Sequence, residues 1–302
     1  MKQPLDITLS GIVDMHVHPS PCLFQRPYDD VEVAKMYASV GAKAILLKNH
    51  YEYTMSRAYH ASKAVPEIQV FGGVVLNRYV GGINPLAAEF ALRMGAKEVW
   101  MPNIDAAAHV EEYGAPGTYQ KKGASSSLKP VQSSSRMLSG KPLSILSNGK
   151  LLDEAKEIVM LVKEHDAALG TSHLSKEEIY ALVRFAKSEG FNKVVITHPY
   201  YRPPAFQMTE LKPLVEQGAT LEFSATISYP PASGTTIAAE AKTIREYGAE
   251  HCVVVSDAGA VPFPAPHEML RVYAQGLFEA GITKDELKTM MIANPKRLLN
   301  LA

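Results

Sequence analysis

Short runs of β-branched and other apolar residues alternate with amphipathic runs along most of the chain. In the amphipathic runs the apolar positions recur every three or four residues, which is the period of a helix with one buried face. This alternation is typical of repeated βα units around a parallel sheet. Because eight such units can be counted, the pattern predicts an α/β fold, a (β/α)8 barrel, rather than a doubly wound sheet.

The predicted elements follow one another in short steps. Strands are expected at about 11–16, 43–48, 69–76, 98–101, 169–173, 194–198, 220–223 and 253–257. Helices are expected at about 30–40, 54–64, 85–94, 151–166, 176–188, 209–216, 237–247, 266–280 and 284–292. Two helix starts carry capping signals: Asp29 or Asp30 at the first, and Ser175 with Glu178 three residues later at the fifth.

The regular rhythm breaks after the fourth strand. Residues from about 106 to 147 are rich in Ser, Gly, Lys and Pro and show no sustained period. A loop of that length is either a functional lid or a disordered insertion, and apolar and aromatic residues such as Tyr119 favour a lid over the strand ends. Near its end, Leu143–Leu146 and then Ser147–Lys150 predict a short strand and a turn. Residues 1–302 are therefore expected to form one TIM-barrel domain with a lid-like insertion at about 106–147.

Composition narrows the class of protein. Lys plus Arg and Asp plus Glu balance at 31 each, which argues against a polyanionic partner such as nucleic acid. No apolar run approaches the roughly 20 residues of a membrane span, and the N-terminus lacks a signal-peptide pattern. With Cys22 and Cys252 as the two cysteines, no disulfide framework is expected. The expectation is a cytoplasmic protein with a small-molecule substrate, no nucleic-acid or membrane partner, and a homo-oligomer left open.

The stretch from Gly11 to Pro19 contains a His-x-His pair. Successive side chains of a strand point to opposite faces, so His16 and His18 are expected on one face, together with Asp14. Two imidazoles on one face form a clamp for a metal ion. In a barrel the C-terminal ends of the strands meet at one face, where the chemistry takes place. Later predicted strands also end in polar, metal-competent side chains: Lys48, His173, His198 and Asp257.

Together these motifs resemble those of the amidohydrolase superfamily of metal-dependent hydrolases. The resemblance rests on Val13–His18 in the first strand, single histidines ending the fifth and sixth strands, Asp257 ending the eighth, and Asn294-Pro295-x-Arg297-Leu298-Leu299 near the C-terminus. The motifs keep their order along nearly the whole barrel. The chain is also similar to a poorly characterised, domain-of-unknown-function branch of that superfamily. The resemblance implies the fold and a metal site, whereas the substrate does not transfer.

Matched position by position, the resemblance assigns roles to the polar strand ends. It implies that His16 and His18 bind the more buried metal ion, and that His173 and His198 serve a second metal or complete a single site. It further implies that Asp257 contacts the metal and takes the proton from the attacking water. Independently of the family, neutral imidazoles and a carboxylate suit Zn²⁺, with Mn²⁺ as another divalent candidate.

One departure from the family pattern concerns the fourth strand. Binuclear members carry a carboxylated lysine or a glutamate at its end, whereas this strand reads Val99-Trp100-Met101-Pro102. Lys48, at the end of the second strand, is the nearest substitute. A carbamylated Lys48 would bridge two metal ions. An uncarbamylated Lys48 would be a charge partner or an oxyanion stabiliser beside a single metal ion, so one or two ions per chain remain open.

The combined prediction is an amidohydrolase-type enzyme that cleaves an amide, lactone, ester or phosphoester bond in a small molecule, with a cyclic amide or lactone preferred by resemblance. Two alternatives stay open: a metal-dependent decarboxylase or hydratase of the same fold, and a non-catalytic metal-binding barrel. Arg78 or Arg202 is a candidate for binding an anionic group bidentately, and His109 is expected to be structural or at the surface. The full set of substrate-binding candidates is His50, Asn77, Arg78, Tyr79, Asn103, Tyr200, Tyr201 and Arg202.

Overall fold

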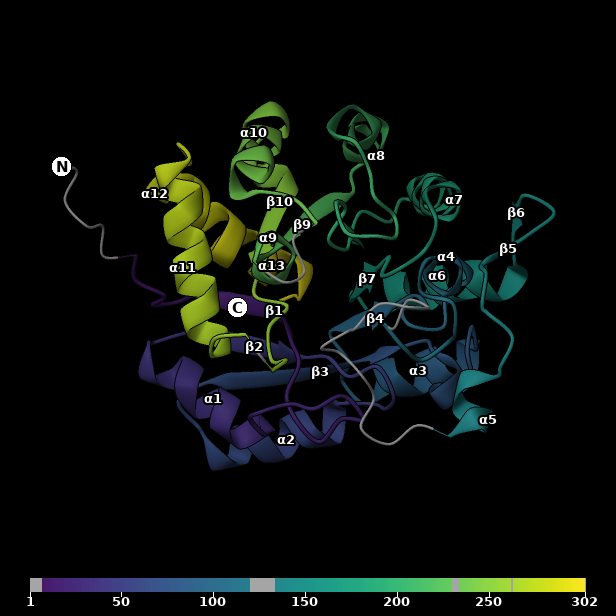
Figure 1. Cartoon of the computed structure of the whole chain (residues 1–302), viewed down its shortest axis with the longest axis horizontal. Coiled ribbons are helices and arrows are strands. Elements are labelled where there is room, and N and C mark those ends of the chain that lie inside the picture. The colour runs from purple at the N-terminus through teal and green to yellow at the C-terminus, as the bar shows by residue number, and fades with distance from the viewer. Residues whose placement is uncertain (1–6, 120–133, 230–233, 262, 302) are drawn as a thin grey trace.

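The computed structural model describes residues 7–119, 134–229, 234–261 and 263–301. Eight parallel strands form one sheet in the order β1-β2-β3-β4-β7-β8-β9-β10, with helices arranged around it (Figure 1). The strands are β1 (Val13–Val17), β2 (Ala44–Leu47), β3 (Gln69–Val75), β4 (Glu98–Trp100), β7 (Ala168–Gly170), β8 (Val194–Ile196), β9 (Thr220–Ser224) and β10 (Cys252–Val255). The predicted (β/α)8 barrel is therefore confirmed.

Hydrogen bonds between the first and last strands complete the ring just beyond the end of β10. The backbone N–H of Asp257 donates to the carbonyl of His16 at 2.8 Å, and that of His18 donates to the carbonyl of Ala258 at 2.9 Å. A Cβ on Gly259 would lie 2.0 Å from the carbonyl oxygen of His18. The two backbone segments approach so closely that only glycine fits there.

Helices follow the strands as the hydrophobic period predicts. α10 has the predicted bounds, and the expected capping boxes at α1 (Asp29 with Glu32) and α7 (Ser175 with Glu178) are both formed. The outer helices are α1 (Asp30–Ser39), α2 (Met55–Ala64), α3 (Pro85–Arg93), α6 (Asp153–Glu164), α7 (Lys176–Ser188), α8 (Lys212–Glu216), α10 (Ile237–Tyr247) and α11 (Pro266–Glu279). Shorter helices are α9 (Ala225–Ser228), α12 (Lys284–Lys288) and α13 (Asn294–Leu298), with 3-10 turns at Arg78–Val80, Met208–Leu211 and Ala249–His251.

Two predictions for the chain's irregular parts need correction. The helix expected at 284–292 is α helical only through Lys288 and continues as a π-helical turn, Thr289–Ala293. The insertion, expected to lack periodic structure, contains two helices, α4 (Ala107–Tyr113) and α5 (Ser135–Leu138). Where a short strand and a turn were predicted at its end, a hairpin is formed by β5 (Leu146–Ser147) and β6 (Lys150–Leu151). These short elements lie together on one side of the barrel (Figure 1). The part of the insertion at 120–133 lies outside the described residues.

The barrel interior is packed around Trp100 of β4. Its indole is fully buried, and a Cβ on Gly170 of the neighbouring β7 would lie 2.2 Å from Trp100 Cδ1. Glycine at that position thus leaves room for the largest side chain of the interior. Because Glu98 lies two residues before Trp100 in β4, its carboxyl group also points into the barrel.

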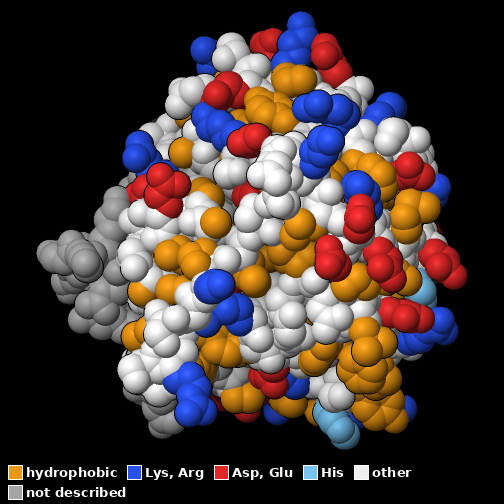
Figure 2. Space-filling model, turned by 90° about the vertical axis from the view of Figure 1, so that its right-hand side faces the viewer, with side chains coloured by type: hydrophobic (Ala, Val, Ile, Leu, Met, Phe, Trp, Pro, Cys, Tyr) orange, Lys and Arg blue, Asp and Glu red, His pale blue; other side chains and the backbone are white. Residues whose placement is uncertain are grey.

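The outside of the protein carries mixed charge. On the face shown in Figure 2, Lys and Arg side chains are interspersed with Asp and Glu rather than gathered into a patch of one sign. Within the described residues, no helix has both the length and the apolar character needed to cross a membrane.

Candidate metal centre

A bulge in β1 turns both histidines of the His-x-His pair into the barrel. Asp14 is paired with Ile45 and Val17 with Leu47, so β1 carries one more residue than β2 over this stretch. Val17 packs with the outer core, and His16 and His18, on either side of it, face the opposite way. The spacing therefore places both rings at the C-terminal end of the barrel.

Asp14 does not share the face of the histidines, and the expectation that it does is wrong. The extra residue reverses the side-chain alternation between Asp14 and His16. The Asp14 carboxylate accepts a hydrogen bond from the hydroxyl of Tyr37 in α1, and from the backbone N–H groups of His16 at 3.2 Å and Ser256 at 3.1 Å. Asp14 thus ties β1 to the end of β10 from outside the barrel.

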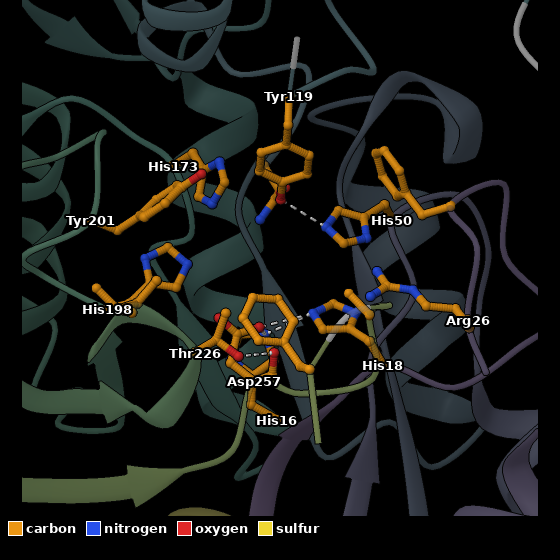
Figure 3. Close-up of a pocket in the computed structure, with 15 residues that line it drawn as sticks. His16, His18, Arg26, His50, Tyr119, His173, His198, Tyr201, Thr226 and Asp257 are labelled. Carbon is orange, nitrogen blue, oxygen red and sulfur yellow. Dashed lines mark hydrogen bonds and ion pairs between the residues drawn. The ribbon is translucent and has the colours of Figure 1, made fainter. Parts of the chain in front are cut away.

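Three ligand atoms converge at the mouth of the barrel (Figure 3). His16 Nε2, His18 Nε2 and Asp257 Oδ1 are separated by 3.1 Å in each of the three pairs. In the described parts of the chain, this is the one group of three or more His, Cys, Asp or Glu side chains with ligand atoms all within 4.8 Å of one another. We call these three residues the metal trio.

Hydrogen bonds on the far side of each ring fix which nitrogen carries the proton. His16 Nδ1 lies 3.0 Å from Oε1 of Glu222, and His18 Nδ1 lies 3.1 Å from the carbonyl oxygen of Lys48. Carboxylate and carbonyl oxygens accept hydrogen bonds, so both protons belong on Nδ1. Neither Nε2 atom then carries a proton. The three atoms of the trio therefore face one another with lone pairs, and no proton lies between them.

This arrangement fits a divalent metal ion such as Zn²⁺. Two ligand atoms about 2.1 Å from one tetrahedral zinc lie roughly 3.4 Å apart, and the trio's separations are 3.1 Å. Burial lowers the pKa of His16 to about 3 and holds that of His18 well below its ordinary value. Both imidazoles are therefore neutral at pH 7 and ready to bind a metal ion without releasing a proton.

Asp257 is the member of the trio that the cavity reaches most readily. Its side chain is 13% exposed, against 1% for His16 and 5% for His18. Its backbone adopts a left-handed conformation, with φ of +49°, at the turn after β10. Thr226 Oγ1 donates to the Asp257 carbonyl at 2.7 Å and holds this turn in place.

His173 and His198, from the ends of β7 and β8, form the other half of the site. Both line the cavity, with ring centroids 5.0 Å apart, but the ring of His198 lies 6.3 Å from that of His16. His173 Nδ1 lies 2.7 Å from His109 Nδ1, and His109 Nε2 lies 2.7 Å from the carbonyl oxygen of Thr118. The insertion helix α4 thus supplies a buried partner for His173.

The proton positions in the series of hydrogen bonds from His173 through His109 to Thr118 follow from the carbonyl of Thr118 at its end. Thr118 O accepts, so His109 Nε2 carries a proton. Burial lowers the pKa of His109 to about 4, so the ring is neutral and its Nδ1 is bare. His173 Nδ1 must then donate to it, which leaves the Nε2 lone pair of His173 free for the cavity.

Lys48 projects into the barrel beneath the trio rather than into the cavity. Its ammonium lies 4.9 Å from the centre of a Trp100 ring and interacts electrostatically with Glu222, Asp257 and Glu98. Burial lowers the pKa of Lys48, and it raises the pKa of Glu98 well above its ordinary value. In the described residues, Lys48 Nζ and both carboxyl oxygens of Glu98 have no hydrogen-bond partner. Burial also raises the pKa of Glu222 to about 7, and the positive charge of Lys48 acts against that rise.

A cavity of about 60 Å³ opens above the trio. Besides the trio, five residues predicted from the sequence to bind substrate or metal lie on its wall: His50, Asn103, His173, His198 and Tyr201. The ring of His50 stacks on that of His18 at 4.8 Å, and His50 Nε2 lies 3.1 Å from the hydroxyl of Tyr119. The full lining is His16, His18, Phe24, Arg26, His50, Asn103, Tyr119, His173, His198, Tyr201, Thr226, Ile227, Asp257, Ala260 and Phe263.

The other substrate-binding candidates do not line this cavity. Asn77 is a buried brace that accepts from the backbone N–H of Asn103 and donates to the carbonyl of His50. Arg78 is paired with Asp105 at 3.2 Å and donates to the carbonyl of Met137. Three more face elsewhere: Tyr79 packs edge-on against Tyr51, Tyr200 bonds Thr243, and Arg202 lines a separate surface hollow.

Sequence reasoning missed several residues that the structure places at the site. Glu222 has a sequence signal, because it is an acid between Leu221 and Phe223 in a predicted strand and must share a face with Thr220 and Ser224. His109 and Arg26 have no such signal, because their directions depend on the course of α4 and of the loop after β1.

Comparisons with solved structures support the fold. A lactonase from Listeria monocytogenes is 14% identical, with a TM-score of 0.60 over 98% of this chain and 96% of that one. The organophosphorus hydrolase from Deinococcus radiodurans is 13% identical, with a TM-score of 0.58 over 95% and 92%. A TatD homolog from Escherichia coli is 14% identical, with a TM-score of 0.57 over 96% and 98%. The resemblance to amidohydrolase-superfamily barrels is confirmed at the level of the fold.

Sequence comparison gives the family directly. No curated protein sequence matches the chain significantly. The profile of DUF6282, described as a family of unknown function, matches residues 11–222. Because the match spans more than half of the 302 residues, the chain belongs to the DUF6282 family.

Proposed function

We propose that this protein is a metal-dependent hydrolase of a small molecule, cleaving a lactone, cyclic amide, ester or phosphoester bond. The observation that carries the proposal is the metal trio, in which three lone-pair atoms lie 3.1 Å apart and both imidazole protons are held on the far side of the rings. The lactonase and the organophosphorus hydrolase of the same fold add support by analogy. A lactone or cyclic amide is the preferred substrate class.

His16, His18 and Asp257 would hold the metal ion, which supplies a lowered pKa for water and a polarised carbonyl or phosphoryl oxygen. Asp257 takes the proton of the attacking water at a carboxylate oxygen and returns it to the leaving group, since it is the most exposed member of the trio. Glu222 and the Lys48 carbonyl hold the two rings in the tautomer that keeps each Nε2 bare. Phe24 and Phe263 line the cavity and reduce its access to water.

We propose one metal ion per chain, with zinc as the first candidate. A bridging carbamate on Lys48 would place a further negative group beside Glu222, whereas the ammonium attracts the Glu222 carboxylate. In the described residues, neither His173 nor His198 belongs to the group whose ligand atoms lie within 4.8 Å of one another, which supports a single metal site. Lys48 therefore acts as a charge partner beneath the site.

Metal content and turnover test the proposal together. Plasma mass spectrometry on protein purified without chelator should give about one metal ion per chain, unchanged in Lys48→Met. Two ions per chain, falling to one in that variant, would support the carbamylated bridge instead.

Asp257→Asn tests the proton transfer. The variant should lose turnover of a lactone and cyclic-amide panel by roughly 10²–10⁴-fold, the usual range for a general acid or base. Its circular dichroism should match wild type. Product analysis separates the alternatives, because release of carbon dioxide would identify a decarboxylase. A fully active Asp257→Asn variant would remove Asp257 from the mechanism.

A further inference from the structure

Two arginines near the loop after β1 have very different surroundings. Arg57, in α2, makes ion pairs with Asp30 at 2.7 Å and Glu52 at 2.7 Å, and it donates to the carbonyls of Ser20 and Pro21. The guanidinium of Arg57 is thus engaged in ion pairs and hydrogen bonds that hold the base of that loop. Arg26, within the loop, has no ion pair in the described part of the chain, and its buried Nε has no hydrogen-bond partner.

The loop is built to present Arg26 to the cavity. Its base is closed by the backbone N–H of Ser20, which donates to the carbonyl of Tyr28 at 2.8 Å, and by Asn49, which donates to the carbonyl of Pro21 at 2.8 Å. Phe24 is 1% exposed and holds the loop by packing against the rings of His50, Tyr51 and Tyr119. In Figure 3 the guanidinium of Arg26 points toward the part of the cavity where His18 and His50 lie.

Within the described residues, no acidic side chain forms an ion pair with Arg26. Among the described residues, Asp257 is the one carboxylate that lines the cavity, and its Oδ1 atom faces His16 and His18. The acids that border the loop are occupied, since Asp29 caps α1 and Asp30 pairs with Arg57. Arg26 lines the same cavity as His50 and the three residues of the metal trio.

We propose that the substrate carries an anionic group, a carboxylate or a phosphate, and that Arg26 binds it while the bond to be cleaved lies at the metal trio. This deepens the proposed function and rests on it. A guanidinium binds either anion through two parallel N–H groups. The small cavity, with Phe24 and Phe263 in its wall, suits a compact molecule whose charged end is fixed at Arg26.

The position of Arg26 differs from what the sequence predicted for an anion-binding arginine. An anion-binding arginine was expected at Arg78 or Arg202. Arg78 is neutralised by Asp105, and Arg202 lies outside the cavity. We therefore assign anion binding to Arg26, the one arginine that lines the cavity among the described residues.

Binding of substrate-sized probes tests this without any turnover. Zinc-loaded wild type, Arg26→Met and Arg26→Lys are titrated calorimetrically with malonate, succinate and glutarate, each compared with its monomethyl ester, and with 3-phosphonopropionate. Each monoester keeps one carboxylate for the metal ion and loses the second. Arg93→Met, at an exposed surface arginine of α3, is the matched control.

For at least one chain length, wild type should bind the diacid roughly 10–100-fold more tightly than the monoester, the range expected for a charge-assisted hydrogen-bond pair. Arg26→Met should reduce that preference to less than about threefold, Arg26→Lys should keep part of it, and Arg93→Met should keep all of it. Tighter binding of 3-phosphonopropionate than of succinate would assign a phosphate as the natural group, and the reverse a carboxylate.

Equal preference in wild type and Arg26→Met, or no preference in wild type, would overturn the proposal. Its failure is distinct from failure of the proposed function. Hydrolysis of uncharged lactones with no preference for diacids would keep the hydrolase and remove the anion site. An intact, Arg26-dependent preference without any turnover would do the opposite.

Discussion

The two halves of the site use histidines in different ways. At the β1 and β10 side, His16 and His18 turn their protons outward to Glu222 and a backbone carbonyl, so that bare nitrogens meet Asp257 at 3.1 Å. At the β7 and β8 side, His173 is bonded through Nδ1 to His109, and its ring lies 5.0 Å from that of His198. One half is assembled for a metal ion, and the other presents separate ring nitrogens to the cavity.

The difference teaches that histidines at barrel strand ends are not equivalent. What separates them is whether other ligand atoms lie within reach of the bare Nε2, and this does not follow from the spacing of the histidines in the sequence. On this basis we expect the first half to bind the metal ion and the second to bind or orient the substrate. Three substitutions test the division, from the largest expected effect to the smallest.

The largest effect is expected from removing one ligand of the trio. His16→Ala leaves two ligands and an uncompensated Glu222, so zinc affinity should fall by more than about a hundredfold and metal content should approach zero. His173→Ala, the same change in the other half, should keep about one metal ion per chain. Metal content and zinc titration against a competing chelator measure both. Loss of metal in His173→Ala to the same degree would erase the difference between the halves.

An intermediate effect is expected from Glu222→Gln. The amide oxygen still accepts from His16 Nδ1, but the negative charge that strengthens the imidazole as a ligand is lost. Zinc affinity should weaken by roughly 10–100-fold, the usual range for a partner of a metal-binding histidine.

Glu98→Gln is the matched control, because Glu98 is an equally buried carboxyl without contact to His16. Its zinc affinity should stay within about threefold of wild type. Equal weakening in both variants would mean that the loss of any buried carboxyl group in the barrel, rather than the contact to His16, weakens zinc binding.

Much of the fold was predictable because each element carries its own local pattern. α10 runs over Ile237–Tyr247 as predicted, because its apolar residues keep a helical period between a Thr cap and a glycine. α4 was missed, because seven residues are too few to establish a period. The bulge in β1 was missed because an extra residue is defined by the register with β2, which the sequence of one strand does not contain.

At the site, sequence reasoning identified the residues at strand ends better than those in loops. His16, His18 and Asp257 are fixed by strands whose ends must meet in a barrel, so their meeting could be anticipated. Arg78 and Arg202 follow strands too, but their directions depend on where the loop turns and on neighbours such as Asp105. Arg26 lies many residues after β1, and only the closed base of its loop places it at the cavity.

The smallest effect is expected at His109, the residue that distinguishes the second half most clearly. If His109 holds the proton of His173 on Nδ1, its loss changes the tautomer of a ring that touches the cavity rather than the metal content. His109→Phe should keep about one zinc per chain, and activity should fall by roughly tenfold or less, the order of one net hydrogen bond.

Nitrogen-15 NMR of the histidine rings should report a bare His173 Nε2 in wild type and a mixture of tautomers in the variant. His109→Gln, whose amide both donates and accepts, should restore the single tautomer, and His60→Phe, at an exposed position of α2, should leave it unchanged. A protonated Nε2 on His173 in wild type would contradict the proton order, and the second half of the site would then donate a hydrogen bond to the substrate instead of accepting one.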